Sequence, residues 1–282
     1  MPRGHDVGMA AQRAARMRER QAARLRPPLG QLVDAAAGRV ARAQARLRPS
    51  DVRRKAVGDF VTAVDLRIEA ELRRGLERLL PDAGFLGEET DAAELDRDWV
   101  WVVDPIDGTS NFARGLPCFA VSVALLDRGA PVLAAVHCAP ERALYTAVRG
   151  QGARREGRRV RAGAGRFDDG AMVGCQWFRG CADMTFLARL QSRGARIRTF
   201  GSSVTQLVDV VAGRLDANVQ QQGRIWDIAA AGLVAREAGL LLTDWSGVPV
   251  FPFADLSIGH TATICAPPRV HRQIVRLLAP FA

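Results

Sequence analysis

An unbroken apolar run, Trp99-Val100-Trp101-Val102-Val103, constrains the fold of this chain more than any other feature. A short continuous apolar run bounded by a turn signal is typical of a buried strand. We expect the strand to end at Asp104-Pro105, because proline has no N–H to donate to the ladder. Further strands are predicted by the runs at 119–126 and 132–136, and a hairpin by 145–148 and 158–160 with glycines between them.

A helix is predicted between Asp65 and Leu80, where apolar residues recur at helical spacing and Pro81 ends the pattern. Glu69 and Arg73 lie four residues apart on it, a spacing that predicts an ion pair. Mixed strands and helices of this kind fit an α+β first half. The second half alternates, with strands expected near 171–175, 196–199 and 240–243 and helices near 184–193, 203–213 and 226–239. Such alternation is typical of layered α/β architecture.

The N-terminal segment is rich in arginine. Residues 1–26 carry seven arginines and two acidic residues, half of the chain's net charge of +10. Because many like charges accompany few large apolar residues, we expect a disordered extension over 1–28 that catalysis does not need. Contact of this tail with RNA or an anionic membrane surface is an alternative. Another is a start site at Met9 or Met17.

Several classes of protein are disfavoured. No apolar stretch approaches the roughly 18 residues that span a bilayer, and arginines interrupt any signal-peptide centre. The five cysteines contain no Cys-x-x-Cys pair, and the four histidines show no zinc spacing. We therefore expect a cytoplasmic protein with free thiols, rather than a disulfide-bonded or zinc-binding one.

Acidic residues gather at three places where a predicted element begins or ends. These are Gly87-Glu88-Glu89-Thr90, Asp104-Pro105-Ile106-Asp107-Gly108-Thr109 and Asp227. Each cluster alone is common in turns or helix caps. Together they offer the several oxygen ligands that Mg²⁺ requires, and the Gly108 and Thr109 amides could hold phosphate. The set therefore favours a metal-dependent phosphate chemistry.

The motifs resemble those of the inositol monophosphatase family of Mg²⁺-dependent, lithium-sensitive phosphatases. The resemblance runs from about residue 30 to the C-terminus. Its four main segments are Asp59-Phe60-Val61-Thr62-Ala63-Val64-Asp65, Gly87–Thr90, Trp101–Phe112 and Trp226-Asp227-Ile228-Ala229-Ala230-Ala231-Gly232. Gly201-Ser202-Ser203 fits the family's substrate-side turn, and Lys55 fits its basic residue.

The resemblance implies a role for each matched residue and a site that takes two or three Mg²⁺ ions. The first metal would be held by Glu88, Asp104 and the Ile106 carbonyl, and the second by Asp104, Asp107 and Asp227. Asp65 and Thr109 would position and deprotonate the attacking water, with Glu88 also in the catalytic set. The implied substrate contacts are Asp107, Gly108, Thr109, Gly201, Ser202, Ser203, Gln220 and Asp227.

The resemblance also implies a layered αβαβα sandwich that forms a homodimer. An α+β half over 29–165 and an α/β half over 166–282 would meet at the site. Inositol 1-phosphate is the substrate it suggests first. Gln220 departs from the family's glutamate seven residues before Asp227, which leaves fructose 1,6-bisphosphate, histidinol phosphate and 3′-phosphoadenosine 5′-phosphate as alternatives. A regulatory, RNA-associated scaffold is the alternative from another class, although none of the five acidic site residues is missing.

Overall fold

The computed structural model describes residues 4–47, 52–56, 59–90, 92–177, 183–256 and 261–281, with side chains from Met17 onward except within 52–61. The first half contains α1 (Gly4–Gln44), β1 (Val52–Ala56), β2 (Asp59–Thr62), α2 (Ala63–Leu79), β3 (Gly84–Gly87), β4 (Trp99–Asp107), α3 (Thr109–Ala113), β5 (Ala120–Asp127), β6 (Ala130–Cys138), β7 (Ala143–Val148), β8 (Gly152–Arg155) and β9 (Arg158–Val160). The second half contains β10 (Met172–Gln176), α4 (Thr185–Gln191), β11 (Arg196–Arg198), α5 (Ser203–Val211), β12 (Ala217–Gly223), α6 (Ile225–Glu237), β13 (Leu241–Thr243), β14 (Thr261–Ala266) and α7 (Pro268–Leu278), followed by a 3₁₀ turn at Ala279–Phe281.

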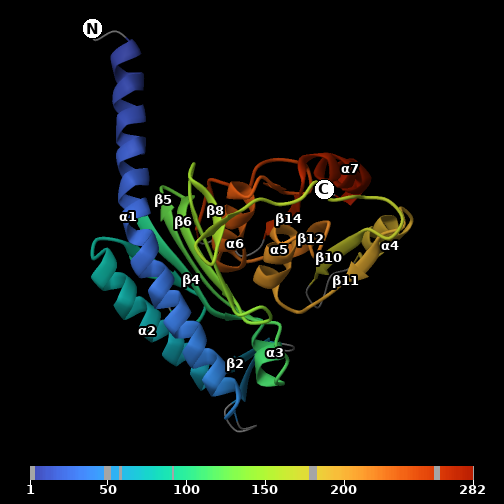
Figure 1. The fold of residues 1–282 in the computed structure, drawn as a ribbon, viewed down its shortest axis with the longest axis horizontal. Coiled ribbons are helices and arrows are strands. Elements are labelled where there is room, and N and C mark those ends of the chain that lie inside the picture. The colour runs from blue at the N-terminus through green and yellow to red at the C-terminus, as the bar shows by residue number, and fades with distance from the viewer. Residues whose placement is uncertain are drawn as a thin grey trace.

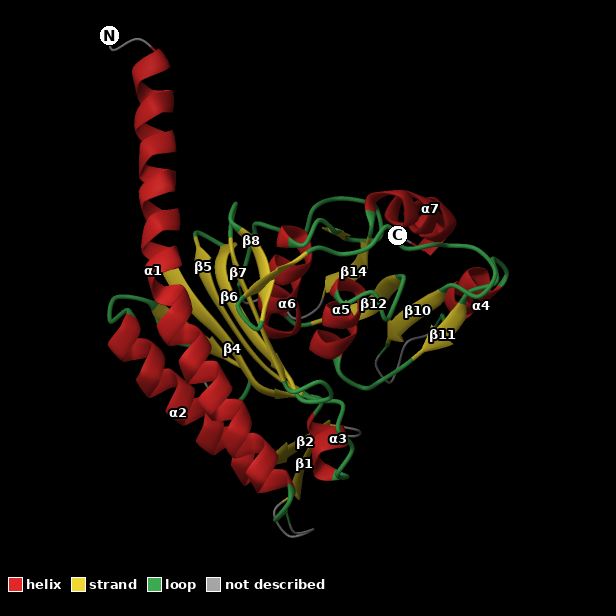
Figure 2. Cartoon of the chain, in the orientation of Figure 1, coloured by secondary structure: helices red, strands yellow, loops and turns green. Residues whose placement is uncertain are grey.

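These elements stack in five layers, which confirms the predicted αβαβα sandwich (Figures 1 and 2). The helices α1 and α2 cover one face of a seven-stranded sheet of order β3-β4-β5-β6-β7-β8-β9. Its other face packs against α5 and α6. Beyond them lies a five-stranded sheet of order β11-β10-β12-β14-β13, covered on its outer face by α4 and α7.

The apolar run of β4 has buried neighbours on both of its faces. Trp101 and Val103 belong to the core under α1 and α2. Val100 and Val102 point to the opposite face and belong to the core under α5 and α6. The strand does not end at Asp104-Pro105 as predicted; it continues to Asp107 through a register shift against β5. Proline removes one ladder bond there without ending the strand.

Helix α1 differs from the sequence prediction. We expected disorder over 1–28, but the helix begins at Gly4 and passes through Pro27 and Pro28 without a break. Each proline lacks a helical N–H, and the burial of Ala22 and Leu29 against the body offsets part of that cost. Arg18 also pairs with Asp98 at 2.6 Å and with Asp127 at 2.7 Å. The beginning of α1 extends beyond the body (Figure 1).

Other differences are local. The predicted hairpin contains an additional strand, β8, between its two arms. The Glu69–Arg73 pair is replaced, because Arg73 pairs with Glu77 at 3.1 Å while Glu69 turns into the interior. Cys118, Cys138, Cys175 and Cys265 are free thiols, and Cys181 lies outside the described residues.

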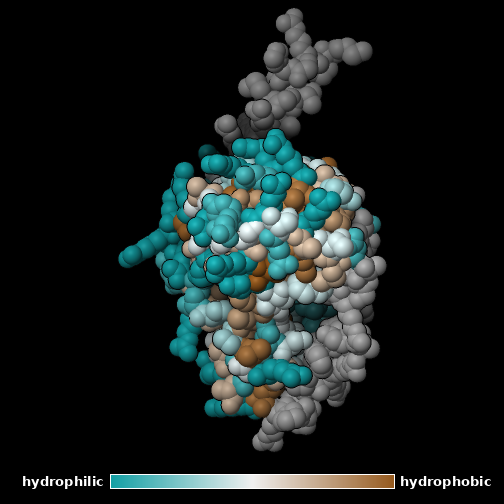
Figure 3. All heavy atoms as spheres, turned by 90° about the vertical axis from the view of Figure 1, so that its right-hand side faces the viewer, coloured by the Kyte–Doolittle hydropathy of each residue, from teal (hydrophilic) through white to brown (hydrophobic). Residues whose placement is uncertain are grey.

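The surface carries isolated apolar side chains. The most exposed large ones are Met17, Val248 and Leu116. Figure 3 looks at the face on the right-hand side of Figure 1 and shows apolar residues scattered among hydrophilic ones. Within the described residues, no helix combines the length and hydrophobicity that a membrane span requires.

Candidate metal centre

Three aspartates from separate elements converge on one point. Asp104 and Asp107 lie at the end of β4, and Asp227 lies in the first turn of α6. One carboxylate oxygen from each lies within 4.8 Å of the other two. All three residues are buried, with exposed fractions of 1%, 6% and 8%. The structure therefore brings together the predicted second-metal set.

Asp107 also fixes the two halves of the chain to each other. Its Oδ1 accepts from Ser203 N at 3.1 Å, and its Oδ2 accepts from Val204 N at 3.0 Å and from the Ser202 hydroxyl. These donors form the beginning of α5, where unpaired N–H groups and the helix dipole favour a negative charge. The predicted substrate-side turn is thus held against the end of β4 by one carboxylate.

Asp227 is placed by the beginning of α6. Its Oδ2 accepts from Arg224 N at 2.7 Å, an arrangement that satisfies one of the free donors of the first turn. One of its carboxylate oxygens lies within 4.8 Å of oxygens of Asp104 and Asp107 at the end of β4. A residue that could simply cap a helix therefore also completes the cluster.

The electrostatics of the cluster suit a cation. Burial raises the pKa of Asp104 well above its ordinary value, and the charges of Glu88, Asp107 and Asp227 raise it further. Burial likewise raises the pKa of Asp107 and of Asp227. The buried Oδ1 of Asp104 has no hydrogen-bond donor among the described residues. An all-carboxylate set with an unsatisfied buried oxygen fits a hard dication such as Mg²⁺.

The two remaining predicted metal ligands lie beside the aspartates. Glu88 N donates to Val103 O at 3.2 Å, which continues the β3–β4 pairing and places Glu88 next to Asp104. The Ile106 carbonyl accepts from Thr109 Oγ1 at 2.9 Å. A carbonyl oxygen has a second lone pair, so this hydrogen bond leaves it able to act as a ligand.

Asp65 and Thr109 lie close together, as the resemblance implies. Asp65 accepts from Thr62 N at 2.9 Å in a capping box that begins α2. Thr109 Oγ1 lies 3.2 Å from Asp65 Oδ1. Burial raises the pKa of Asp65. A hydroxyl between two acceptors, Asp65 and the Ile106 carbonyl, can pass a proton toward the carboxylate.

The loop at Gly108 and the turn at 201–203 approach each other closely. Gly108 has φ +88°, and a Cβ there would lie 2.8 Å from Cys118 O and 3.1 Å from Ser202 Cβ, so only glycine fits. Asn111 Nδ2 donates to Cys118 O at 2.7 Å and to Phe200 O at 2.6 Å. Asn111 stands within the motif that carries the resemblance, but no role was predicted for it.

Gln220 is fully buried in β12. Its Nε2 donates to Ser203 O at 3.5 Å, and its Oε1 accepts from Thr263 Oγ1 at 3.4 Å. The side chain thus lies in the interior behind the substrate-side turn, and direct contact with a substrate stays a prediction. The side chain of Lys55 lies outside the described part of the chain.

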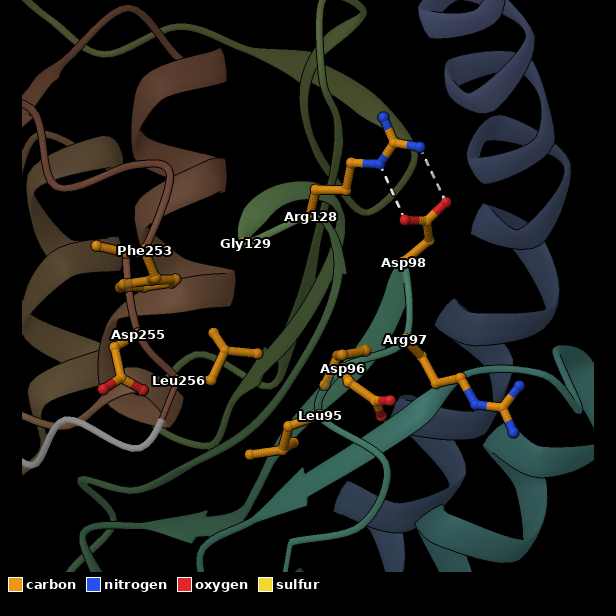
Figure 4. A pocket seen from close by; sticks show the side chains of 11 residues that line it. Leu95, Asp96, Arg97, Asp98, Arg128, Gly129, Phe253, Asp255 and Leu256 are labelled. Carbon is orange, nitrogen blue, oxygen red and sulfur yellow. Dashed lines mark hydrogen bonds and ion pairs between the residues drawn. The ribbon is translucent and has the colours of Figure 1, made fainter.

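A separate pocket of about 600 Å³ lies at the other end of β4 (Figure 4). Its lining comes from residues 95–98, the β5–β6 turn and residues 253–256. Arg128, at its rim, is paired with Asp98 through bonds of 2.9 and 3.1 Å. None of the predicted site residues lines it.

Comparison with known proteins places this geometry in context. The sequence profile of the inositol monophosphatase family matches residues 26–279. A protein of Pasteurella multocida named Nus factor SuhB is 34% identical over 232 residues, which cover 80% of this chain and 85% of that protein. The Nus factor SuhB of Escherichia coli K12 is 37% identical over 199 residues, which cover 68% of this chain and 74% of that protein.

Solved structures show the same fold. The extragenic suppressor protein suhB from Bartonella henselae superposes with a TM-score of 0.80 at 30% identity, over 89% of this chain and 97% of that one. A Thermotoga maritima IMPase superposes with a TM-score of 0.78 at 27% identity, over 89% of this chain and 94% of that one.

Proposed function

The chain belongs to the inositol monophosphatase family, and on this basis we propose that it is a Mg²⁺-dependent phosphatase that hydrolyses inositol 1-phosphate. The observation that supports this most is the convergence of Asp104, Asp107 and Asp227 within 4.8 Å. Three buried carboxylates repel one another, so a fold that gathers them is costly unless a cation binds there. We propose two or three Mg²⁺ ions per site.

The residues divide the work of phosphate ester hydrolysis. Glu88, Asp104, the Ile106 carbonyl, Asp107 and Asp227 would hold the metal ions. When bound, Mg²⁺ supplies a water nucleophile near neutral pH and neutralises charge on the leaving oxygen. Thr109 Oγ1 would accept the proton of the attacking water and pass its own toward Asp65, 3.2 Å away. The amides of Gly108 and Thr109 would hold the phosphate.

Selectivity for the alcohol belongs to the second half of the chain. We propose that the turn Gly201-Ser202-Ser203 contacts the substrate and that Gln220 supports it from behind, through Ser203 O. A neutral amide at 220 gives weaker hydrogen bonds than a carboxylate would. We therefore expect weak discrimination among small phosphate esters.

Phosphate release tests the proposal. The panel is inositol 1-phosphate, glycerol 2-phosphate, fructose 1,6-bisphosphate, histidinol phosphate and 3′-phosphoadenosine 5′-phosphate, each with Mg²⁺ or with chelator. We expect hydrolysis of inositol 1-phosphate and of several others, lost on chelation. Undiminished activity after exhaustive chelation would refute the mechanism. If the protein prefers another ester by more than about a hundredfold, that ester rather than inositol 1-phosphate is its substrate.

A regulatory, RNA-associated role is a second candidate. Relatives at 34% and 37% identity carry the name Nus factor, and the arginine-rich beginning of α1 extends beyond the body (Figure 1). Binding of labelled single-stranded RNA should weaken steeply with salt and fall on removal of residues 1–26. Equal binding by the full and shortened chains would exclude the beginning of α1 as the RNA contact.

We also propose that the protein forms a homodimer, and light scattering in solution tests this.

A further inference from the structure

Glu69 is a buried carboxylate to which the proposed mechanism gives no role. It follows Asp65 by four residues on α2, so the two side chains share one face of the helix. Its exposed fraction is 0%. The other glutamates of α2 lie nearer the surface, where Glu71 pairs with Arg39 at 2.7 Å and Glu77 with Arg73 at 3.1 Å. Burial of a carboxylate is costly unless it makes specific hydrogen bonds.

The Glu69 carboxylate contacts the loop that follows β3. Its Oε2 accepts from Glu89 N at 2.9 Å. A Cβ added at Gly87 would lie 2.5 Å from Glu69 Cδ and 2.6 Å from each of its oxygens. The carboxylate therefore occupies the space that a side chain at position 87 would need. Gly87 and Glu89 flank Glu88, so Glu69 contacts the chain on both sides of a predicted metal ligand.

Glu88 itself is held from the other direction by β4. Its N–H donates to Val103 O at 3.2 Å, and Val103 immediately precedes Asp104. The loop is thus fixed between a β4 carbonyl and the Glu69 carboxylate. The hydrogen bond from Glu89 N requires an acceptor oxygen at this reach, which a carboxylate or an amide of the same length supplies. With these two anchors, the half-buried Glu88 is held beside Asp104.

We propose that Glu69 is a positioning residue that holds the Gly87–Glu89 loop so that Glu88 reaches the metal site beside Asp104. The inference deepens the proposed function, on which the metal site rests. Helix α2 then serves the site twice: Asp65 orients Thr109, and one turn later Glu69 orients the loop that carries Glu88. Substitution of residues that orient a metal ligand without touching the metal typically changes metal affinity by about 10- to 100-fold.

Two substitutions separate position from charge. Glu69→Gln keeps an acceptor at the same reach and removes the charge, whereas Glu69→Asp keeps the charge and withdraws the acceptor by one methylene. The readout is the Mg²⁺ concentration that gives half of the full rise in melting temperature, which requires no activity. Phosphate release against Mg²⁺ is measured in parallel. Glu77→Asp is the matched control, because Glu77 is exposed on the same helix.

We expect Glu69→Asp to raise the half-saturating Mg²⁺ concentration at least about tenfold and Glu69→Gln less than about threefold. The control should leave it unchanged. The reverse order would show that Glu69 acts through its charge, and a lowered melting temperature with unchanged Mg²⁺ response in both variants would show a purely structural role. Either result overturns the inference.

Two further outcomes are informative. If a Glu69 variant does not fold, Gly87→Ala carries the test, because its methyl group must displace the carboxylate or the loop. An unchanged Mg²⁺ response in Gly87→Ala would also refute the inference. If no ester of the panel is hydrolysed but Mg²⁺ still stabilises the protein, the phosphatase proposal fails while the role of Glu69 is still decided by the melting data.

Discussion

Asp104→Asn should have opposite effects on activity and on the stability of the metal-free protein. In the proposed site this carboxylate would serve both metal positions, so its loss should reduce kcat/KM at least about a thousandfold, or about 4 kcal/mol of transition-state stabilisation. Without metal, the same carboxylate is repelled by its neighbours. A neutral amide of equal size removes that repulsion and can donate to the remaining carboxylates.

The geometry gives the size of the second effect. Charges no more than 4.8 Å apart repel by at least about 3.5 kcal/mol at an effective dielectric constant of about 20. Protonation relieves part of this repulsion, because burial and the neighbouring charges raise the pKa of Asp104. A gain of about 1–3 kcal/mol in the free energy of unfolding then remains. For a chain of this length it corresponds to a rise of about 2–6 °C in melting temperature.

The assay is thermal unfolding in chelator and in saturating Mg²⁺, alongside phosphate release. In chelator we expect Asp104→Asn to melt above the unsubstituted protein, and in Mg²⁺ below it. Asp96→Asn is the control, because Asp96 is exposed just before β4. A variant that melts at or below the unsubstituted protein in chelator would refute the repulsion argument. Activity within tenfold of the unsubstituted protein would refute the bridging role.

Three further outcomes are expected. Burial raises the pKa of Asp107 to about 6 and of Asp227 to about 7. The folded state therefore holds protons that the unfolded chain releases above about pH 4, so the stability of the metal-free protein should fall as pH rises to about 7. The Mg²⁺-induced rise in melting temperature should grow over the same pH range. Removal of residues 1–26 should leave kcat unchanged but cost about 1–3 kcal/mol of stability, since it deletes the Arg18 ion pairs and buried Ala22; an unchanged denaturation midpoint would contradict this. Gln220→Glu should raise the preference for inositol 1-phosphate over glycerol 2-phosphate and lower the melting temperature by burying a charge; an unchanged ratio would place selectivity elsewhere.

The strongest local patterns predicted the central elements. The apolar run of β4 requires cover on both faces, and the helix predicted near 203–213 is present as α5, which Ser202 caps. The strand β12 was missed because its interior positions carry amides, among them Asn218 and Gln220, whose Nδ2 and Nε2 groups donate to backbone carbonyls inside the fold. Helix α7 was missed because Pro267-Pro268 resembles a break, although proline is favoured at the first helical position.

Only those site residues that stand in a local sequence pattern were predicted. Acidic residues that follow an apolar strand can be recognised from the local sequence alone. Asp104 and Asp107 were predicted in this way, and they lie together at the end of β4. Glu69 was hidden because a glutamate four residues before Arg73 resembles a surface ion pair. Only the packing of α2 against β3 shows that this carboxylate lies inside and contacts Glu89 N. Long-range burial, rather than local spacing, decided its role.

The layer formed by α5 and α6 has a consequence for dissection of the chain. Their apolar residues, including Val208 and Ile228, share one core with Val102 of the first sheet and with Leu242 of the second. A cut between β9 and β10 would leave the first fragment with an uncovered sheet face and the second with two bare helices. Neither piece could bury its apolar surface alone, so co-expressed fragments should recover structure only by reassembling with each other.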